Sequence, residues 1–115
     1  MIIWIIGLSG AGKTTLGREV FERLKSTSPN TVFLDGDDIR KYFRQDTEEL
    51  DYSVEGRRKN GDRIQKICAW LDAQDINVVC CILSLFPEMQ RQNRVLFSSY
   101  YEIYLKVPME ELFLR

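Results

Sequence analysis

A glycine-rich segment that directly follows an apolar run constrains this chain more than any other feature. It reads Gly-Leu-Ser-Gly-Ala-Gly-Lys-Thr at residues 7–14 and satisfies the spacing Gly-x4-Gly-Lys-Thr. Before it, Ile2 to Ile6 are apolar throughout, as in a strand buried on both faces, and after it the residues from about Lys13 to Ser26 have helical period. A strand, a glycine loop and a helix in this order predict a phosphate-binding loop.

Each residue type in this loop has a physical task. Glycines let the backbone turn tightly and aim successive N–H groups at phosphate oxygens, beside the positive end of a helix dipole. Lys13 is expected to reach the β- and γ-phosphates, and the Thr14 hydroxyl suits Mg²⁺. The competing interpretation is a chance glycine-rich turn, which average residue usage makes uncommon. The residues expected to bind ATP are Gly7, Leu8, Ser9, Gly10, Ala11, Gly12, Lys13, Thr14 and Thr15.

Beyond the loop, short β-branched runs alternate with longer stretches of helical period, as in βαβ units. Strands are expected at 2–6, 31–34, 76–83 and 101–107, and helices at about 13–26, 38–44, 53–73, 87–97 and from 108 onward. Such an order predicts an α/β fold with a mainly parallel sheet and helices on both faces, a three-layer α/β/α arrangement. We expect one domain over residues 1–115, with ligands at the carboxyl ends of the strands.

Composition excludes several other classes of protein. Sixteen basic residues against seventeen acidic ones give a net charge of -1, which argues against a nucleic-acid partner. The absence of histidine removes Ser-His and Cys-His nucleophile pairs, so proton transfer falls to carboxylates or lysines. Cys68, Cys80 and Cys81 cannot all pair with one another and are predicted to be reduced, mostly buried thiols. The apolar start is too short to span a bilayer, so we expect a cytoplasmic protein without a membrane partner.

Two acidic residues follow the second predicted strand. Asp35 and Asp37 flank Gly36 and should therefore lie at the edge of the sheet where phosphates are expected. One carboxylate would hold a magnesium-bound water and the other would accept a proton, because phosphoryl transfer depends mainly on positioning and charge neutralisation. The alternative is a turn with a helix cap, which Asp and Gly favour in any protein.

A second set of polar residues, Arg40, Arg57, Asn60 and Arg63, is suited to an anionic acceptor. Guanidinium groups bind phosphate or sulfate oxygens in bidentate fashion, and Asn addresses sugar or base edges. A solvated surface is the commoner explanation for a basic run such as residues 57–59. Ser84 ends the third predicted strand at the ligand edge, where a serine is often only a turn residue.

Together these segments resemble the adenylylsulfate kinase (APS kinase) family of P-loop nucleotide kinases, through essentially the whole chain. Residues 7–15 resemble its phosphate loop, and residues 34–40 its Leu-Asp-Gly-Asp-x-x-Arg segment. The residues that carry the remaining similarity are Ser53, Arg57, Asn60 and Arg63, then Ile82-Leu83-Ser84, then Val107-Pro108-Met109-Glu110. The resemblance implies a P-loop NTPase fold and a phosphotransferase with an alcohol acceptor.

The implied reaction uses ATP with Mg²⁺ and moves the γ-phosphate to the ribose 3′-hydroxyl of adenosine 5′-phosphosulfate (APS), as in sulfate assimilation, giving the 3′-phosphorylated product (PAPS) and ADP. By resemblance, Asp37 is the base or orienter, Lys13 and Ser84 join it as catalytic residues, and Thr14 and Asp35 are the metal partners. The implied acceptor contacts are Asp37, Arg40, Arg57, Asn60, Ile82, Leu83 and Ser84. Family members often self-associate, so a homodimer is a further expectation.

Three departures keep other functions open. The stretch from Arg40 to Ser53 is longer than the usual family pattern, and Leu85-Phe86-Pro87 replace a common Pro-Tyr-Arg. The sequence also ends at Arg115, before the family's Asp-Pro-Lys-Gly-Leu-Tyr lid and last strand, so we expect a domain truncated at its C-terminus. One alternative is a related kinase for another nucleotide, such as cytidine diphosphoramidate. The other is a nucleotide-binding regulatory module without transferase activity.

Overall fold

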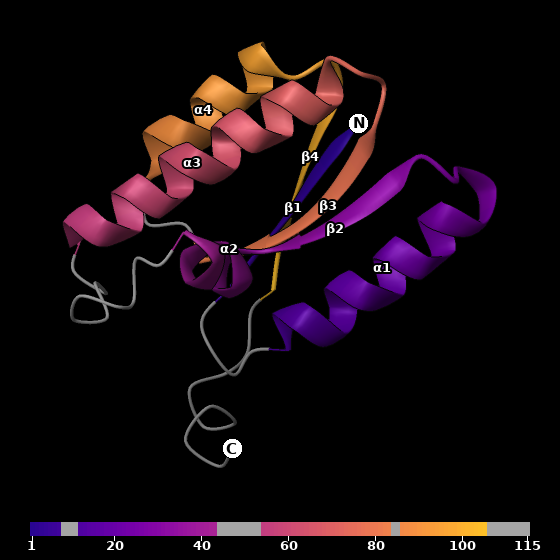
Figure 1. Cartoon of the computed structure of the whole chain (residues 1–115), viewed down its shortest axis with the longest axis horizontal. Coiled ribbons are helices and arrows are strands. Elements are labelled where there is room, and N and C mark those ends of the chain that lie inside the picture. The colour runs from indigo at the N-terminus through magenta and orange to yellow at the C-terminus, as the bar shows by residue number, and fades with distance from the viewer. Residues whose placement is uncertain (8–11, 44–53, 84–85, 106–115) are drawn as a thin grey trace.

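The computed structural model describes residues 1–7, 12–43, 54–83 and 86–105 (Figure 1). Strands and helices alternate along most of the chain, as the periodicity predicts. In chain order the elements are β1 (Ile2–Ile6), α1 (Lys13–Thr27), β2 (Thr31–Asp35), α2 (Gly36–Tyr42), α3 (Val54–Asp72), β3 (Asn77–Ile82), α4 (Pro87–Leu96) and β4 (Tyr100–Tyr104).

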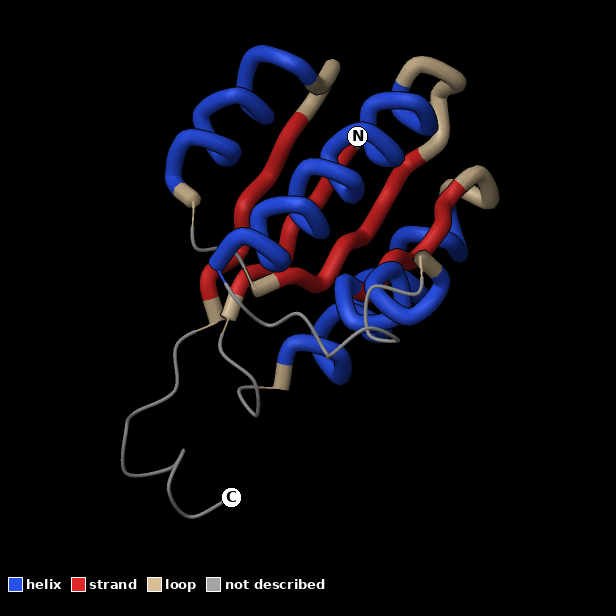
Figure 2. Tube along the Cα trace, turned by 60° about the vertical axis from the view of Figure 1, so that its left-hand side comes forward, coloured by secondary structure: helices blue, strands red, loops and turns tan. Residues whose placement is uncertain are grey.

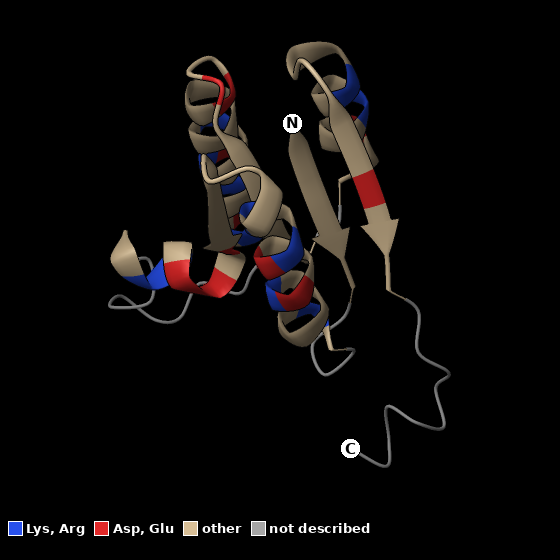
Figure 3. Ribbon diagram, turned by 90° about the vertical axis from the view of Figure 1, so that its right-hand side faces the viewer, with Lys and Arg blue, Asp and Glu red and all other residues tan. Residues whose placement is uncertain are grey.

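The described strands form one parallel sheet in the order β2-β3-β1-β4. Figures 1 and 2 show α1 on one face of the sheet and α3 and α4 on the other, while α2 lies at the carboxyl ends of the strands. Charged residues lie mainly on the helices, and the strands contain few of them (Figure 3). The predicted three-layer α/β/α fold with a parallel sheet is therefore confirmed.

Two apolar clusters hold the layers together. On one face, Leu16 and Val20 of α1 pack against Ile5 and its neighbours in the sheet. On the other face, Ile64 of α3 joins a cluster that contains Trp4, whose ring meets Tyr100 edge-on at 6.1 Å between centroids. Because its side chains alternate between these clusters, β1 is buried along its whole length, as its apolar sequence predicts.

The boundaries of most elements lie within one or two residues of the expected ones, and the largest shifts have local causes. The short helix predicted at 38–44 begins instead at Gly36, because the Asp35 side chain caps it by accepting a hydrogen bond from the Asp37 N–H. The last strand begins at Tyr100, which is paired with Ile2, and ends at Tyr104. Residues 106 and 107 and the helix predicted from 108 lie outside the described residues.

The predicted state of the cysteines is confirmed. Cys68, Cys80 and Cys81 are all free and buried. A hydrogen bond with Cys68 and burial together raise the pKa of Cys80 well above its usual value, so this thiol is neutral at physiological pH. Among the described helices, none combines the length and the apolar character that a membrane span requires.

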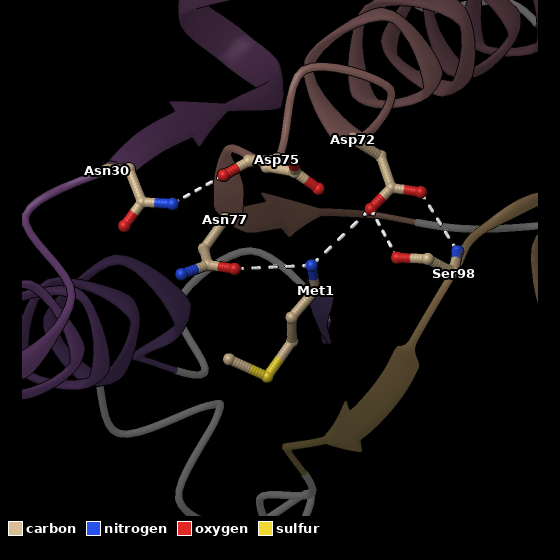
Figure 4. A network of polar contacts seen from close by, with 6 residues as sticks. All are labelled: Met1, Asn30, Asp72, Asp75, Asn77 and Ser98. Atoms are coloured by element: carbon tan, nitrogen blue, oxygen red, sulfur yellow. Dashed lines mark hydrogen bonds and ion pairs between the residues drawn. The ribbon is translucent and has the colours of Figure 1, made fainter.

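A polar network connects several elements at the amino ends of the strands (Figure 4). The ammonium group of Met1 lies 3.4 Å from Oδ1 of Asp72 and 3.2 Å from Oδ1 of Asn77. Asp72 also accepts hydrogen bonds from the backbone N–H and the hydroxyl of Ser98, at 2.9 and 2.8 Å. The network joins β1, the end of α3 and the turn before β4, and so fixes the edge of the fold opposite the predicted ligand edge.

Candidate active site

A polar pocket lies at the carboxyl ends of the strands, where parallel α/β sheets bind their ligands. Its walls come from the start of α1, the end of β2, the short helix α2, the first half of α3 and the end of β3. The described residues that line it are Lys13, Thr14, Asp35, Gly36, Asp37, Arg40, Arg57, Asn60, Gly61, Cys81, Ile82 and Leu83.

The two described glycines of the phosphate loop sit where other residues would be strained. Gly12 has φ 89° and ψ 21°, the left-handed region, and it forms the N-cap of α1. A Cβ on Gly7 would lie 3.1 Å from the Leu105 carbonyl oxygen and 3.3 Å from Cγ of Lys13. The loop thus turns directly into the N-terminus of α1, whose dipole favours anions and whose first residue is Lys13. Four loop residues, 8–11, lie outside the described ones.

Asp35 connects three elements around the pocket. Its Oδ2 accepts a hydrogen bond from the Thr14 hydroxyl at 3.2 Å, and its Oδ1 accepts one from the Asp37 N–H at 2.9 Å. The helix cap that the sequence offered as the alternative is therefore present, and Asp35 also lines the pocket, while its role as a metal partner stays a prediction. Its carboxylate links β2 with α1 and α2, and it faces the pocket together with Asp37.

The oxygen atoms of Thr14 and Asp35 fit a magnesium site in chemical type. Mg²⁺ prefers oxygen ligands and is often held by one or two protein groups, with waters and phosphate oxygens completing its shell. Within the described residues there is no cluster of three or more His, Cys, Asp or Glu side chains that could hold a metal by themselves. The two oxygen ligands therefore suit a Mg²⁺ ion whose other ligands are waters and the phosphate oxygens of a nucleotide.

From α3, the pocket receives a buried amide side chain. Asn60 is only 4% exposed, and its Nδ2 donates a hydrogen bond to the Gly36 carbonyl oxygen at 3.0 Å. Its Oδ1 is buried and has no hydrogen-bond partner among the described residues. A buried acceptor without a donor costs free energy, so Oδ1 is suited to a ligand that presents a hydroxyl or amino group.

Basic side chains balance the two carboxylates in this pocket. Lys13 lies at the start of α1, Arg40 on α2 is 7% exposed, and Arg57 is near the start of α3. These cations come from three different elements, so they surround the pocket rather than forming a surface stripe. Such an arrangement is suited to neutralising the charge of a phosphate group at several points.

Cys81 is a pocket residue that the sequence analysis treated only as a buried thiol. Its Sγ donates a hydrogen bond to the Lys13 carbonyl oxygen at 3.2 Å. Burial, with the nearby charge of Asp35, raises the pKa of Cys81 to about 11, so the thiol stays protonated at neutral pH. A Cβ on Gly17 would overlap the Cys81 sulfur, which shows how closely α1 approaches β3. Side chains alternate between the two faces along β3, and this alternation is the sequence signal that could have placed Cys81 on the face that α1 covers.

The pocket brings together most of the predicted site residues that the structure describes. These are Lys13, Thr14, Asp35, Asp37, Arg40, Arg57, Asn60, Ile82 and Leu83. Thr15 follows in the first turn of α1 and is exposed, outside the described lining. Ser84 lies outside the described residues, as do Leu8, Ser9, Gly10 and Ala11. Gly36 and Gly61 were not predicted as lining residues; each allows two elements to approach closely, which depends on packing rather than on a motif.

Comparison with known proteins gives one family over the whole chain. Residues 1–115 match the family model described as adenylylsulphate kinase. A cytidine diphosphoramidate kinase of Campylobacter jejuni is 36% identical over 114 residues, which cover 99% of this chain and 65% of that protein. An adenylyl-sulfate kinase of Halothermothrix orenii is 33% identical over 108 residues, which cover 94% of this chain and 57% of that protein. The chain thus spans less than two thirds of the length of these relatives.

A solved structure supports the same fold. The crystal structure of APE1195 superimposes with a TM-score of 0.83 at 27% sequence identity, covering 100% of this chain and 65% of that one. The fold of this chain is therefore one that is also found in a longer chain.

Proposed function

Because the chain belongs to the adenylylsulphate kinase family, we propose that it carries the phosphate-binding and acceptor-binding parts of an ATP-dependent nucleotide 3′-kinase. The observation that supports this most directly is a single pocket lined by Lys13, Asp37 and Asn60, which come from α1, α2 and α3. In the proposed reaction the γ-phosphate of ATP moves to a ribose 3′-hydroxyl. Residues 1–115 would belong to one kinase domain, and the cytoplasm is its proposed location.

On the donor side, the N-terminus of α1 and the Lys13 ammonium group would hold the β- and γ-phosphates. Thr14 and Asp35 would hold Mg²⁺, which when bound neutralises charge on the β- and γ-phosphate oxygens. Since Asp35 also caps α2, the same carboxylate keeps Asp37 next to the phosphates.

Asp37 would orient the acceptor hydroxyl and receive its proton. The hydroxyl oxygen forms a bond to the γ-phosphorus while the bond from that phosphorus to the β–γ bridging oxygen breaks, and ADP leaves. The proton of the hydroxyl passes to the Asp37 carboxylate. In-line transfer to a bound hydroxyl is already an aligned route, so this scheme needs no phosphoserine at Ser84.

The first proposed acceptor is APS, whose anionic phosphosulfate group suits Arg40 and Arg57. The family model and the relative named adenylyl-sulfate kinase support it. The second is cytidine diphosphoramidate, supported by the 36% identical relative that carries that name. Both are nucleotides with anionic groups and hydroxyls, so the polar pocket suits either one, and Asn60 Oδ1 would accept a hydrogen bond from one of their donor groups.

An ADP-release assay with ATP, Mg²⁺ and each acceptor in turn tests the proposal. Formation of a 3′-phosphorylated product with one acceptor supports it and names the substrate. ATP binding without acceptor-dependent ADP formation would instead favour a nucleotide-binding regulatory module, and the absence of any product with every nucleotide acceptor would overturn the kinase assignment.

A further inference from the structure

The helix that presents Asp37 and Arg40 to the pocket is short. α2 has seven residues, which is fewer than an isolated helix needs to be stable in water. Its orientation must therefore come from contacts with its neighbours. A small rotation of this helix would move both side chains, since Asp37 and Arg40 are three residues apart on one face.

The first contact lies at the start of α2. Nδ2 of Asn60 donates a hydrogen bond to the carbonyl oxygen of Gly36, the first residue of the helix, at 3.0 Å. Close by, a Cβ on Gly36 would lie 3.6 Å from Ile64 and 3.3 Å from the Cys81 carbonyl oxygen. The N-terminal end of α2 is therefore fixed between α3 and the end of β3.

The second contact lies at the other end of α2. The Arg63 guanidinium carbon sits 4.4 Å from the centroid of the Phe43 ring, within the range of a cation–π contact. Phe43 is the C-cap residue of α2, and its N–H donates to the Ile39 carbonyl oxygen at 3.0 Å. The ring is therefore attached to the last turn of the helix, and a contact that holds the ring also holds this end of α2.

Both contacts come from the same face of α3. Asn60 and Arg63 are three residues apart, so they are neighbours on that helix. The sequence placed Arg63 in a set of polar residues suited to an anionic acceptor, but the acceptor contacts that the resemblance implies do not include it. It is also not among the described residues that line the pocket. Its position over Phe43 gives it a different role from those of Arg57 and Asn60.

We propose that Arg63 is a positioning residue of the kinase site, which fixes the C-terminal end of α2 through Phe43 while Asn60 fixes the N-terminal end. Without the Arg63 contact, α2 would keep the Asn60 hydrogen bond, the Asp35 cap and the packing of Ile39 in the core. Its C-terminal end would be held less firmly, which would loosen the common orientation of Asp37 and Arg40. The effect on catalysis rests on the proposed function. The effect on α2 itself does not, and it is measured separately.

Hydrogen exchange of the amides in residues 36–43, followed by mass spectrometry, measures how firmly α2 is held. Arg63→Ala should speed their exchange about two- to fivefold, the factor that corresponds to a cation–π contact at an exposed site. Phe43→Leu should also speed exchange, and the effect of the double variant should be smaller than the two single effects combined, because both substitutions remove the Arg63–Phe43 contact. Phe43→Trp, which keeps an aromatic face, should retain protection.

Lys66→Ala is the matched control, because Lys66 is a cation on α3 whose contact is an exposed ion pair with Asp62 at 3.0 Å. It should leave exchange in α2 unchanged. Unchanged α2 exchange in Arg63→Ala, additive effects in the double variant, or equally faster exchange in α1 and β3 would each overturn the proposal, the last because Arg63 would then be a general stabiliser.

Kinetics provide the second readout. Arg63→Ala should lower kcat/KM for the nucleotide acceptor about two- to fivefold at an unchanged KM for ATP, and Arg63→Lys should recover part of the loss because an ammonium group also interacts with a ring face. Equal losses for ATP and acceptor would overturn the positioning role. If the wild-type protein transfers phosphate to no acceptor, the proposed function fails, while the exchange experiment still decides whether Arg63 holds α2.

Discussion

The Thr14 hydroxyl donates a hydrogen bond to Oδ2 of Asp35, with 3.2 Å between the two oxygens, and so joins the first turn of α1 to the end of β2. The other oxygen of Asp35 accepts from the Asp37 N–H at the start of α2. One carboxylate therefore sets the relative positions of the proposed metal partner Thr14 and the proposed base Asp37. This double role allows its structural and chemical contributions to be separated by substitution.

Asp35→Asn should preserve the fold and raise the Mg²⁺ concentration needed for turnover, because Asn caps helices about as well as Asp but carries no charge. Asp35→Ala should also destabilise the fold, by about 0.5–2 kcal/mol, through loss of the cap. Denaturant unfolding and a Mg²⁺ titration of activity check the two parts. An unchanged Mg²⁺ requirement in Asp35→Asn would argue against a metal role for this residue.

Lys13→Ala should weaken ATP binding about 10- to 100-fold, since a charge-assisted contact with phosphate contributes roughly 1.5–3 kcal/mol. Calorimetric titration with Mg²⁺ and ATP measures the change. Arg23→Ala is the control, because Arg23 lies on the same helix and forms an exposed ion pair with Glu19. ATP affinity equal to that of the wild type in Lys13→Ala would remove Lys13 from the phosphate site.

Asp37→Asn should lower kcat by about a hundredfold or more while leaving ATP binding nearly unchanged, because general-base assistance contributes roughly 10²- to 10⁴-fold. The hydrogen bond from the backbone N–H of residue 37 to the Asp35 carboxylate is retained in this variant. Asp38→Asn is a close control: Asp38 lies in the same first turn of α2, is exposed, and is not among the described lining residues. Equal losses of ATP binding and turnover in Asp37→Asn would indicate a metal-binding or folding role instead.

The sequence predicts the layers of this fold well because they depend on local patterns. The unbroken apolar run of residues 2–6 predicts a strand buried on both faces, and the helical period after Gly12 predicts α1. The start of α2 was missed by two residues, since whether Asp35 caps a helix or ends a turn depends on where its side chain finds a donor.

The parts that could not be predicted are contacts between elements. Arg63 was grouped by residue type with side chains suited to an anionic acceptor, and the contact of its guanidinium with Phe43 was not predicted. Cys81 was predicted to be buried but not to contact Lys13. Both outcomes depend on how α2, α3 and α1 pack on the sheet, and periodicity carries no information about distances between elements.

Acid stability should depend on Asp72 at the amino edge of the sheet. Burial alone would raise the pKa of Asp72, but the Ser98 hydrogen bonds and the Met1 ammonium group outweigh it, and the pKa is lowered from its usual value of 3.8. The stability that this group contributes is therefore present above pH 3.8 and is lost as the pH falls through the lower folded-state pKa.

Asp72→Asn should accordingly be less stable than the wild type at neutral pH. When the pH falls below 3.8, the variant should lose less unfolding free energy than the wild type does. Urea unfolding at a series of pH values compares the two slopes. Asp62→Asn is the control, because its exposed ion pair with Lys66 should contribute little. If the unfolding free energy of Asp72→Asn and of the wild type changed equally with pH, protonation of Asp72 would not weaken the network in Figure 4.

The close approach of α1 to β3 predicts a coupled pair of substitutions. Gly17→Ala would place a methyl group into the Cys81 sulfur, so the variant should lose about 1–3 kcal/mol of unfolding free energy. Cys81→Ala in the same background removes the sulfur and should recover part of that loss. The recovery should be incomplete, because a Cβ at position 17 would still lie 3.1 Å from Cε2 of Phe33.

Denaturant unfolding of the wild type, both single variants and the double variant completes a thermodynamic cycle. A favourable coupling free energy between the two substitutions is expected, since the sulfur and the added methyl group compete for the same space. The affinity for ATP should fall in the same order of variants as the unfolding free energy. Cys81 contacts the carbonyl of Lys13, so a displaced α1 would move that residue. Strictly additive losses would mean that α1 shifts away freely, and that the phosphate loop is not held in place by this contact.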